Sequence, residues 1–205
     1  MLKYIIYLLV AVIIAGLIGG GIHLYRVAAK NKKEMAQYNG EAVAVNQKLG
    51  KVLVVYYSLS GHTREIAETI KAKTGGDIYE IKTAEEIKAT PIFYMKIKQQ
   101  IKNKEYPALA GEIPDIGQYD RVFVGSPVWW YTLSTPVSAF LQRIDFQGKK
   151  VVPFSTQGSN FGSYFDDFAA QAKNADIQPA EAFNNLSHEY DKAVDNKISR
   201  WLNRL

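Results

Sequence analysis

A turn rich in hydroxyl groups, SLSGHT at residues 58–63, offers the first chemistry in this sequence. A phosphate monoester needs several hydrogen-bond donors at once. This turn could supply three side-chain hydroxyls, backbone N–H groups and the N-terminus of a following helix. Gly61 would let the backbone close around the phosphate without a Cβ in the way. An ordinary Ser/Thr cap on a helix is the alternative. The candidate phosphate-binding residues are Ser58, Leu59, Ser60, Gly61, His62 and Thr63.

Three consecutive aromatic residues, Trp129 to Tyr131, follow shortly after a predicted strand at 121–126. Rings of this size cannot all point into one core, and ligands of open α/β sheets bind where strands end. A flat aromatic ligand would gain offset stacking against such side chains. The alternative is that one of the two tryptophans only covers the sheet edge. The candidate residues of this segment are Ser126, Pro127, Val128, Trp129, Trp130 and Tyr131.

A third candidate loop, STQGSNFG at residues 155–162, follows a predicted strand at 151–154. Its glycines and hydroxyls would leave backbone N–H groups free to meet a ligand. A plain surface turn is the alternative, but this loop follows a strand just as the other two do. The candidate residues here are Thr156, Gln157, Gly158, Phe161 and Gly162.

Five predicted strands alternate with helices and would position these loops. Apolar runs such as Val52–Val55 are typical of strands buried on both faces of a parallel sheet. We expect strands at 52–55, 77–83, 121–126, 151–154 and 180–183, and helices at 64–72, 92–101, 163–172 and 190–205, with one more starting at Thr135. The long connections allow right-handed crossovers. The pattern predicts a doubly wound α/β fold with a five-stranded parallel sheet of order 2-1-3-4-5, and all three loops on one edge.

These segments resemble the flavodoxin family. The pattern S-x-S-G-x-T at 58–63 is similar to the phosphate loop of flavodoxins, where it holds the phosphate of FMN. The segment GSPVWW at 125–130 resembles a flavin-contacting loop of that family, and IPDIGQYD at 113–120 matches the stretch before its third strand. The resemblance spans most of residues 51–205. It implies a flavodoxin-like fold, FMN as the cofactor, and contact between the third loop and the pyrimidine side of the flavin.

The resemblance leaves two classes of function open. The domain could carry electrons between redox partner proteins through an exposed flavin edge, or it could be an enzyme that oxidises NAD(P)H and reduces a quinone or another small acceptor. Residues 51–205 are nearly neutral, whereas flavodoxins tend to be acidic, and the segment 127–130 lacks the glycine that many flavodoxins carry there. No side chain stands out as a general acid or base, so we assign no catalytic residue.

An uncharged apolar segment, residues 4–22, begins the chain, and residues 24 and 25 extend it. Twenty-two helical residues at roughly 1.5 Å each span the ~30 Å hydrocarbon core, so residues 4–25 would contact membrane lipid. A cleaved signal peptide is the alternative. Four basic residues follow the segment and only Lys3 precedes it, which predicts a single-pass anchor in the cell membrane with the domain in the cytoplasm. Gly16 and Gly20 could bring two anchors together as a homodimer.

Composition and charge exclude several other classes. The chain has no cysteine, which removes disulfides, thiolate catalysis and Cys-ligated metals, and three histidines are too few for a metal site. Residues 1–50 carry +4 and residues 51–205 carry +1, so no basic stripe suggests a nucleic-acid partner. Neither G-x-G-x-x-G nor G-x-x-x-x-G-K-[ST] occurs. We expect an anchor with its basic flank at 1–30, a linker of partly helical character at 31–50, and the FMN-binding domain at 51–205.

Overall fold

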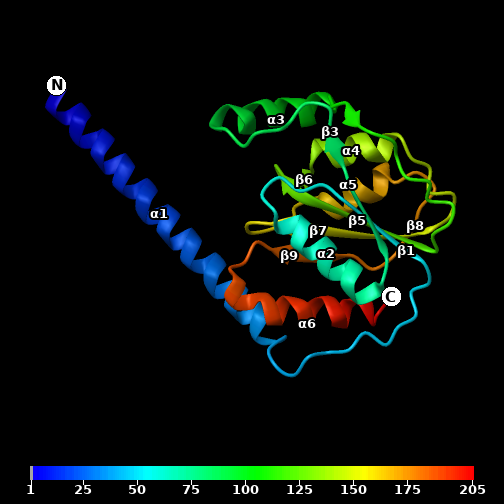
Figure 1. Cartoon of the computed structure of the whole chain (residues 1–205). Coiled ribbons are helices and arrows are strands. Elements are labelled where there is room, and N and C mark those ends of the chain that lie inside the picture. Colours follow the sequence, from blue (N-terminus) through cyan, green and yellow to red (C-terminus); the bar gives the residue numbers. More distant parts are fainter. Residues whose placement is uncertain (1) are drawn as a thin grey trace.

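A parallel β-sheet forms the centre of the computed structural model, which describes residues 2–205. Helices cover both of its faces, and one long helix projects away from the domain (Figure 1). The main strands are β1 (Val52–Tyr56), β2 (Asp77–Glu80), β5 (Arg121–Trp129), β7 (Lys150–Gln157), β8 (Asp176–Ile177) and β9 (Glu181–Asn184). They pair in the order β2-β1-β5-β7-β8, with β9 also on β7. This order confirms the predicted 2-1-3-4-5 arrangement, in which β8 and β9 together take the place of the fifth strand.

The strands that carry the candidate loops run longer than the sequence predicts. β5 continues through Trp129 because its pairing with β7 extends to Pro127 and Thr156, and because β6 (Thr132–Leu133) folds back on it as a hairpin. The predicted ends at residues 126 and 154 are therefore wrong. The predicted strand 77–83 also divides at Ile81, since β3 (Lys82–Thr83) leaves β2 and pairs with β4 (Leu109–Ala110).

Two apolar layers hold the helices against the sheet. The helices are α1 (Leu2–Ala36), α2 (His62–Thr74), α3 (Pro91–Asn103), α4 (Thr135–Gln142), α5 (Tyr164–Gln171), the 3₁₀ turn η1 (His188–Tyr190) and α6 (Asp191–Leu202). One buried cluster joins α3, α4 and α5 to one face, with Phe140 and Phe168 at its centre. The other joins α2 and α6 to the opposite face around Trp201, whose ring meets Phe123 and Phe154 edge to face.

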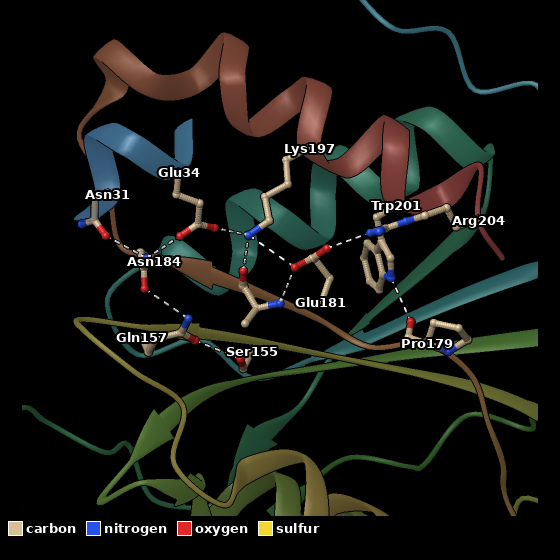
Figure 2. Close-up of polar contacts among 11 residues, drawn as sticks. Asn31, Glu34, Ser155, Gln157, Pro179, Glu181, Asn184, Lys197, Trp201 and Arg204 are labelled. Atoms are coloured by element: carbon tan, nitrogen blue, oxygen red, sulfur yellow. Dashed lines mark hydrogen bonds and ion pairs between the residues drawn. The ribbon is translucent and has the colours of Figure 1, made fainter. Parts of the chain in front are cut away.

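The final turns of α1 are fixed to the domain. Lys197 of α6 is almost wholly buried, and its ammonium group contacts a carboxylate oxygen of Glu34 at 2.7 Å, one of Glu181 at 3.3 Å and the carbonyl oxygen of Ala182 at 2.6 Å (Figure 2). The side chain of Asn184 donates to the side-chain oxygen of Asn31 at 2.8 Å. The expected linker is thus helical up to Ala36, and its beginning is anchored to the domain.

The chain between α1 and β1 also follows the domain surface. The amide of Asn196 donates to the carbonyl oxygens of Tyr38 and Glu41, and its oxygen accepts from the N–H of Val43 at 2.9 Å. Asn203 at the end of α6 contacts the backbone of residues 44, 46 and 47 in the same way. Side-chain amides of α6 therefore satisfy a segment that has no secondary structure of its own. The boundaries at 30/31 and 50/51 stay a prediction.

The apolar part of α1 makes little contact with the rest of the domain. Its side chains from Tyr4 to Tyr25 are exposed, and its most apolar stretch is not buried. α1 is long and apolar enough to cross a membrane, but a signal sequence near the N-terminus would meet the same two criteria. The anchor and its dimerisation through Gly16 and Gly20 stay predictions.

We expect Lys197→Ala to destabilise the domain by about 2–4 kcal/mol, because it leaves Glu34 and Glu181 facing each other without their shared cation. Arg204→Ala is the matched control. Arg204 also pairs with Glu181, but its side chain is 64% exposed, so its loss should cost less than about 1 kcal/mol. Denaturant unfolding of the full chain in detergent measures both. Equal losses for the two variants would contradict this view of the junction.

Candidate functional site

The hydroxyl-rich turn leads from β1 into α2. Gly61 is the N-cap of α2, with φ of 102°, a value that strongly favours glycine, and no side chain caps the helix. The predicted alternative, a Ser/Thr cap, is therefore wrong. Instead, the hydroxyl of Ser58 accepts a hydrogen bond from the N–H of Gly61 at 3.1 Å and closes the turn.

The N-terminus of α2 has the features that an anion requires. The first N–H groups of a helix have no partner within the helix, and here no capping side chain supplies one. A Cβ built on Gly61 would meet no atom within 4 Å, so the space beside the turn is open. Ser60 is exposed at this place. These donors, together with the positive end of the helix dipole, fit a phosphate group.

Two threonines connect this turn to the third loop. Thr63 is only 1% exposed, and its hydroxyl lies 2.7 Å from that of Thr156 at the end of β7. This contact spans 93 positions in the sequence. It fixes the start of α2 beside the loop that follows β7, so the candidate phosphate turn and the third loop form one site.

The aromatic segment after β5 is a tight hairpin. Trp130 and Tyr131 are the two residues between β5 and β6, and both have positive φ, 49° and 67°. Such a turn usually contains Asn and Gly, because bulky residues are strained in this conformation. Neighbouring segments hold the turn. The indole N–H of Trp130 donates to the carbonyl oxygen of Tyr94 at 2.9 Å, and the N–H of Ser163 donates to the carbonyl oxygen of Tyr131 at 2.9 Å.

Trp129 and Trp130 have different surroundings. Trp129 is 7% exposed, and its ring meets Tyr57 and Phe93 edge to face at 5.6 and 5.2 Å. Trp130 is 43% exposed, with the ammonium group of Lys98 4.7 Å from the centre of its ring. One tryptophan therefore supports the core, and the other faces outward.

The phenol of Tyr57, which packs against Trp129, stays neutral at physiological pH. Burial raises the pKa of Tyr57 to about 12, and the nearby carboxylate of Glu80 adds to this rise.

A cavity of about 270 Å³ lies between the hairpin, the third loop and α3. Its lining is largely aromatic and apolar, with a few amide and hydroxyl groups. It is lined by Phe93, Tyr94, Ile97, Val128, Trp129, Trp130, Tyr131, Gln157, Gly158, Ser159 and Asn160. A flat aromatic ring would find both stacking partners and hydrogen-bonding groups in this cavity.

A chain of hydrogen bonds orients Gln157 at the edge of this cavity. Its side-chain oxygen accepts from the hydroxyl of Ser155 at 2.9 Å, and its amide nitrogen donates to Asn184 at 3.2 Å. Asn184 in turn donates to Asn31 of α1 (Figure 2). These bonds place the junction with α1 next to the third loop.

The structure brings most of the predicted residues together, but it places them in different surroundings. The turn 58–63 and the loop 155–162 meet at Thr63 and Thr156, whereas Ser126 is fully buried, with its hydroxyl 2.8 Å from that of Ser134. Phe161 is exposed, and Gly162 passes so close to Tyr131 that a Cβ would lie 2.4 Å from the Cβ of Tyr131. Sequence reasoning missed Phe93, Tyr94, Ile97, Ser159, Asn160 and Asn184.

A larger cavity lies elsewhere. It measures about 530 Å³ and lies between α2 and the segment 184–195, with charged residues of both signs on its walls. His62 and Thr156 border it, but the hairpin does not. We place the candidate ring site in the smaller cavity because aromatic side chains gather there. Among residues 2–205, no group of three His, Asp or Glu side chains is arranged to hold a metal ion.

Comparison with known proteins agrees with these features. A family model described as Flavodoxin matches residues 51–205. The crystal structure of a flavoprotein from Lactobacillus acidophilus in complex with FMN superposes with a TM-score of 0.60 at 27% identity, covering 65% of this chain and 93% of that one. A Bacteroides eggerthii protein assigned to the flavoproteins gives 0.64 at 27% identity, covering 75% of this chain and 96% of its own.

A curated relative has an enzyme name. The NAD(P)H dehydrogenase (quinone) of Cupriavidus metallidurans is 28% identical over 100 residues. The match covers 46% of this chain and 47% of that protein, so the chain spans about half the length of the curated relative that it matches.

Proposed function

The chain belongs to the flavodoxin family, and from this premise we propose that it is an FMN-binding redox protein tethered to a membrane by α1. The observation that carries the proposal is the convergence of three loops on one sheet edge, with an uncapped helix N-terminus on one side and an aromatic cavity on the other. FMN has one phosphate and one flat tricyclic ring. Each of these two parts finds a matching environment.

The phosphate of FMN would lie over the start of α2. Its oxygens would accept hydrogen bonds from the first N–H groups of the helix and from the hydroxyl of Ser60, which is exposed there. The buried hydroxyls of Thr63 and Thr156 would support the turn by contacting each other. The guanidinium group of Arg64 contacts Glu80 and the hydroxyl of Tyr56, so the phosphate donors in this proposal are N–H and hydroxyl groups.

The ring of FMN would lie in the cavity between Trp130, Tyr131 and the third loop. Gln157, held by Ser155 and Asn184, would offer polar groups to the pyrimidine side of the ring. FMN supplies the redox chemistry when bound, while the protein positions it and tunes its potential.

Electron transfer between proteins is the first candidate activity. Trp130 and Tyr131 are 43% and 59% exposed, so the cavity opens to the surface at its aromatic side. A partner protein could approach the ring there without a conformational change. Among the described residues that line this cavity, no pair of acid and base groups occurs, which suits a carrier that moves electrons without rearranging the bonds of a substrate.

Reduction of a quinone or another small acceptor by NAD(P)H is the second candidate. The name of the Cupriavidus metallidurans relative favours it, although the match covers only about half of each chain. The same open cavity would then receive a small acceptor. In either case, four basic residues after the apolar segment favour an anchor whose following domain faces the cytoplasm, where FMN and NAD(P)H are available.

We expect Gly61→Ala to weaken FMN binding roughly tenfold, because a Cβ at φ of 102° costs about 1–2 kcal/mol unless the turn shifts away from the phosphate. Gly75→Ala is the matched control: Gly75, the C-cap of the same helix, also has positive φ and open space around it. It should lower stability and leave FMN affinity unchanged. Quenching of flavin fluorescence measures both affinities. Unchanged affinity in Gly61→Ala would remove this turn from the site.

Reduction of the FMN-loaded full chain separates the two activities. A carrier should accept electrons one at a time in a reductive titration followed by visible absorbance, and it should oxidise NADPH slowly. A reductase should be bleached in a single two-electron step and should consume NAD(P)H rapidly when a quinone is added. We expect the first behaviour. Rapid, quinone-dependent NAD(P)H oxidation would refute the carrier and establish the reductase.

A further inference from the structure

The membrane helix and α3 lie on either side of the same loop. Lys30 and Glu34 of α1 line a hollow together with Ser159, Asn160 and Phe161 of the third loop. Ser159 and Asn160 also line the aromatic cavity, whose other wall is formed by α3. From α1 to α3, these elements follow one another along the edge of the sheet where the candidate site lies. In Figure 1 the free part of α1 and the helix α3 both project toward the left of the view.

The outward face of α3 exposes apolar side chains. Phe93 and Ile97 point into the domain and pack against its core. Ile92 and Met95 point outward, and each is 77% exposed. Tyr94 is 53% exposed between these two faces. Along the same edge, Trp130, Tyr131 and Phe161 are also exposed. Large exposed apolar groups that share one side of a molecule mark an interaction surface.

Positive charge accompanies these apolar groups. Residues 87–104 contain five lysines and no acidic residue: Lys88, Lys96, Lys98, Lys102 and Lys104. The whole segment 51–205 has 19 basic and 18 acidic residues, so without these five lysines 14 basic residues would face 18 acidic ones. A helix with exposed apolar residues among lysines is typical of a helix that lies in the plane of a membrane interface. Exposed aromatic side chains are also enriched at that depth.

We propose that the edge of the domain between α1 and α3 rests on the anionic surface of the membrane that holds α1, with α3 lying in the interface. Ile92 and Met95 enter the boundary of the acyl chains, while the lysines meet lipid phosphates. This inference rests on the membrane tether of the proposed function. An anionic bilayer fits better than an acidic protein, because α1 already places a bilayer beside this edge. The cytoplasmic leaflet, on which positive-inside orientation places the domain, carries anionic lipids.

This contact defines the class of acceptor that can reach the site. The aromatic cavity shares Tyr94 and Trp130 with the membrane-facing edge, and the ammonium group of Lys98 lies over Trp130. With α3 in the interface, the mouth of the cavity opens at the depth of the lipid headgroups. The acceptor that fits this position resides in the same membrane, as a membrane-bound redox partner or a lipid-dissolved quinone would, and a freely water-soluble partner protein would find the mouth covered.

The chain contains no cysteine, so a single introduced cysteine can carry an environment-sensitive bimane label. We would label Met95→Cys in the full chain, reconstituted in vesicles that contain nitroxide-bearing lipids. The vesicles hold about three parts phosphatidylcholine to one part phosphatidylglycerol, with pure phosphatidylcholine as the neutral comparison. Ile177→Cys is the matched control. Like Met95, Ile177 is an exposed apolar residue, but it lies on β8, which pairs with the beginning of β7 at the opposite end of the sheet.

We expect lipid nitroxides to lower the fluorescence at position 95 roughly twofold or more in anionic vesicles, and to leave position 177 unchanged. The triple variant Lys96→Gln, Lys102→Gln, Lys104→Gln should weaken this contact roughly a hundredfold, which removes the quenching. It leaves Lys98, which covers Trp130, in place. Quenching at position 95 that is no greater than at position 177 would overturn the proposal and leave this face to an acidic protein. Quenching that survives in the triple variant would overturn the assignment of these lysines to lipid phosphates.

Failure of the proposed function would give a different result. Flotation of the same vesicles reports whether α1 holds the chain in the membrane, and their visible absorbance reports whether FMN is bound. Protein that floats and binds FMN but shows no quenching at position 95 refutes only the contact of α3. Flotation depends on α1, and FMN binding does not require α3 to touch lipid, so the two proposals are tested separately.

Discussion

The parallel pairing of β1, β5 and β7 is the constraint on which the rest of the structure depends. Because the three strands run in the same direction in register, the loops that follow them leave the sheet at one edge. One loop begins a helix without a capping side chain, one forms an aromatic hairpin, and one supplies amide and hydroxyl groups. The contact between Thr63 and Thr156 then joins the first of these loops to the third. No single loop could bind both a phosphate and a flat ring.

Local patterns in the sequence were sufficient to predict the order of the main strands and the position of the hydroxyl-rich turn, although not all strand ends. Apolar runs mark buried parallel strands, and glycine at position 61 marks a backbone conformation that few other residues adopt. The hairpin at Trp130 and Tyr131 could not be predicted this way, because two-residue turns of this kind usually contain Asn and Gly, and this turn contains neither. Its conformation depends on Tyr94 and Ser163, which are distant in the sequence. The helical spacing of residues 92–101 predicted α3, but nothing in it showed that this helix would form a wall of the cavity.

The junction with α1 was equally hidden in the sequence. From the sequence, a lysine in the C-terminal amphipathic helix is expected to be exposed to solvent, yet Lys197 is buried against Glu34 and Glu181. Pairing with two carboxylates makes that burial tolerable. As a consequence, the apolar part of α1 continues from a helical segment that is fixed to the domain, and not from a flexible linker. Under the proposed membrane tether, the candidate site would therefore have a defined orientation relative to the membrane.

Comparison of FMN with riboflavin, which has the same ring but lacks the phosphate, tests the central claim most directly. Each would be titrated into the purified full chain in detergent and followed by the visible absorbance of the flavin. If the phosphate lies over the start of α2 and the ring in the aromatic cavity, FMN should bind at one per chain and at least roughly a hundredfold more tightly than riboflavin, since several charge-assisted hydrogen bonds are lost with the phosphate. Equal affinity for the two flavins, or no change in the FMN spectrum at excess protein, would contradict the account.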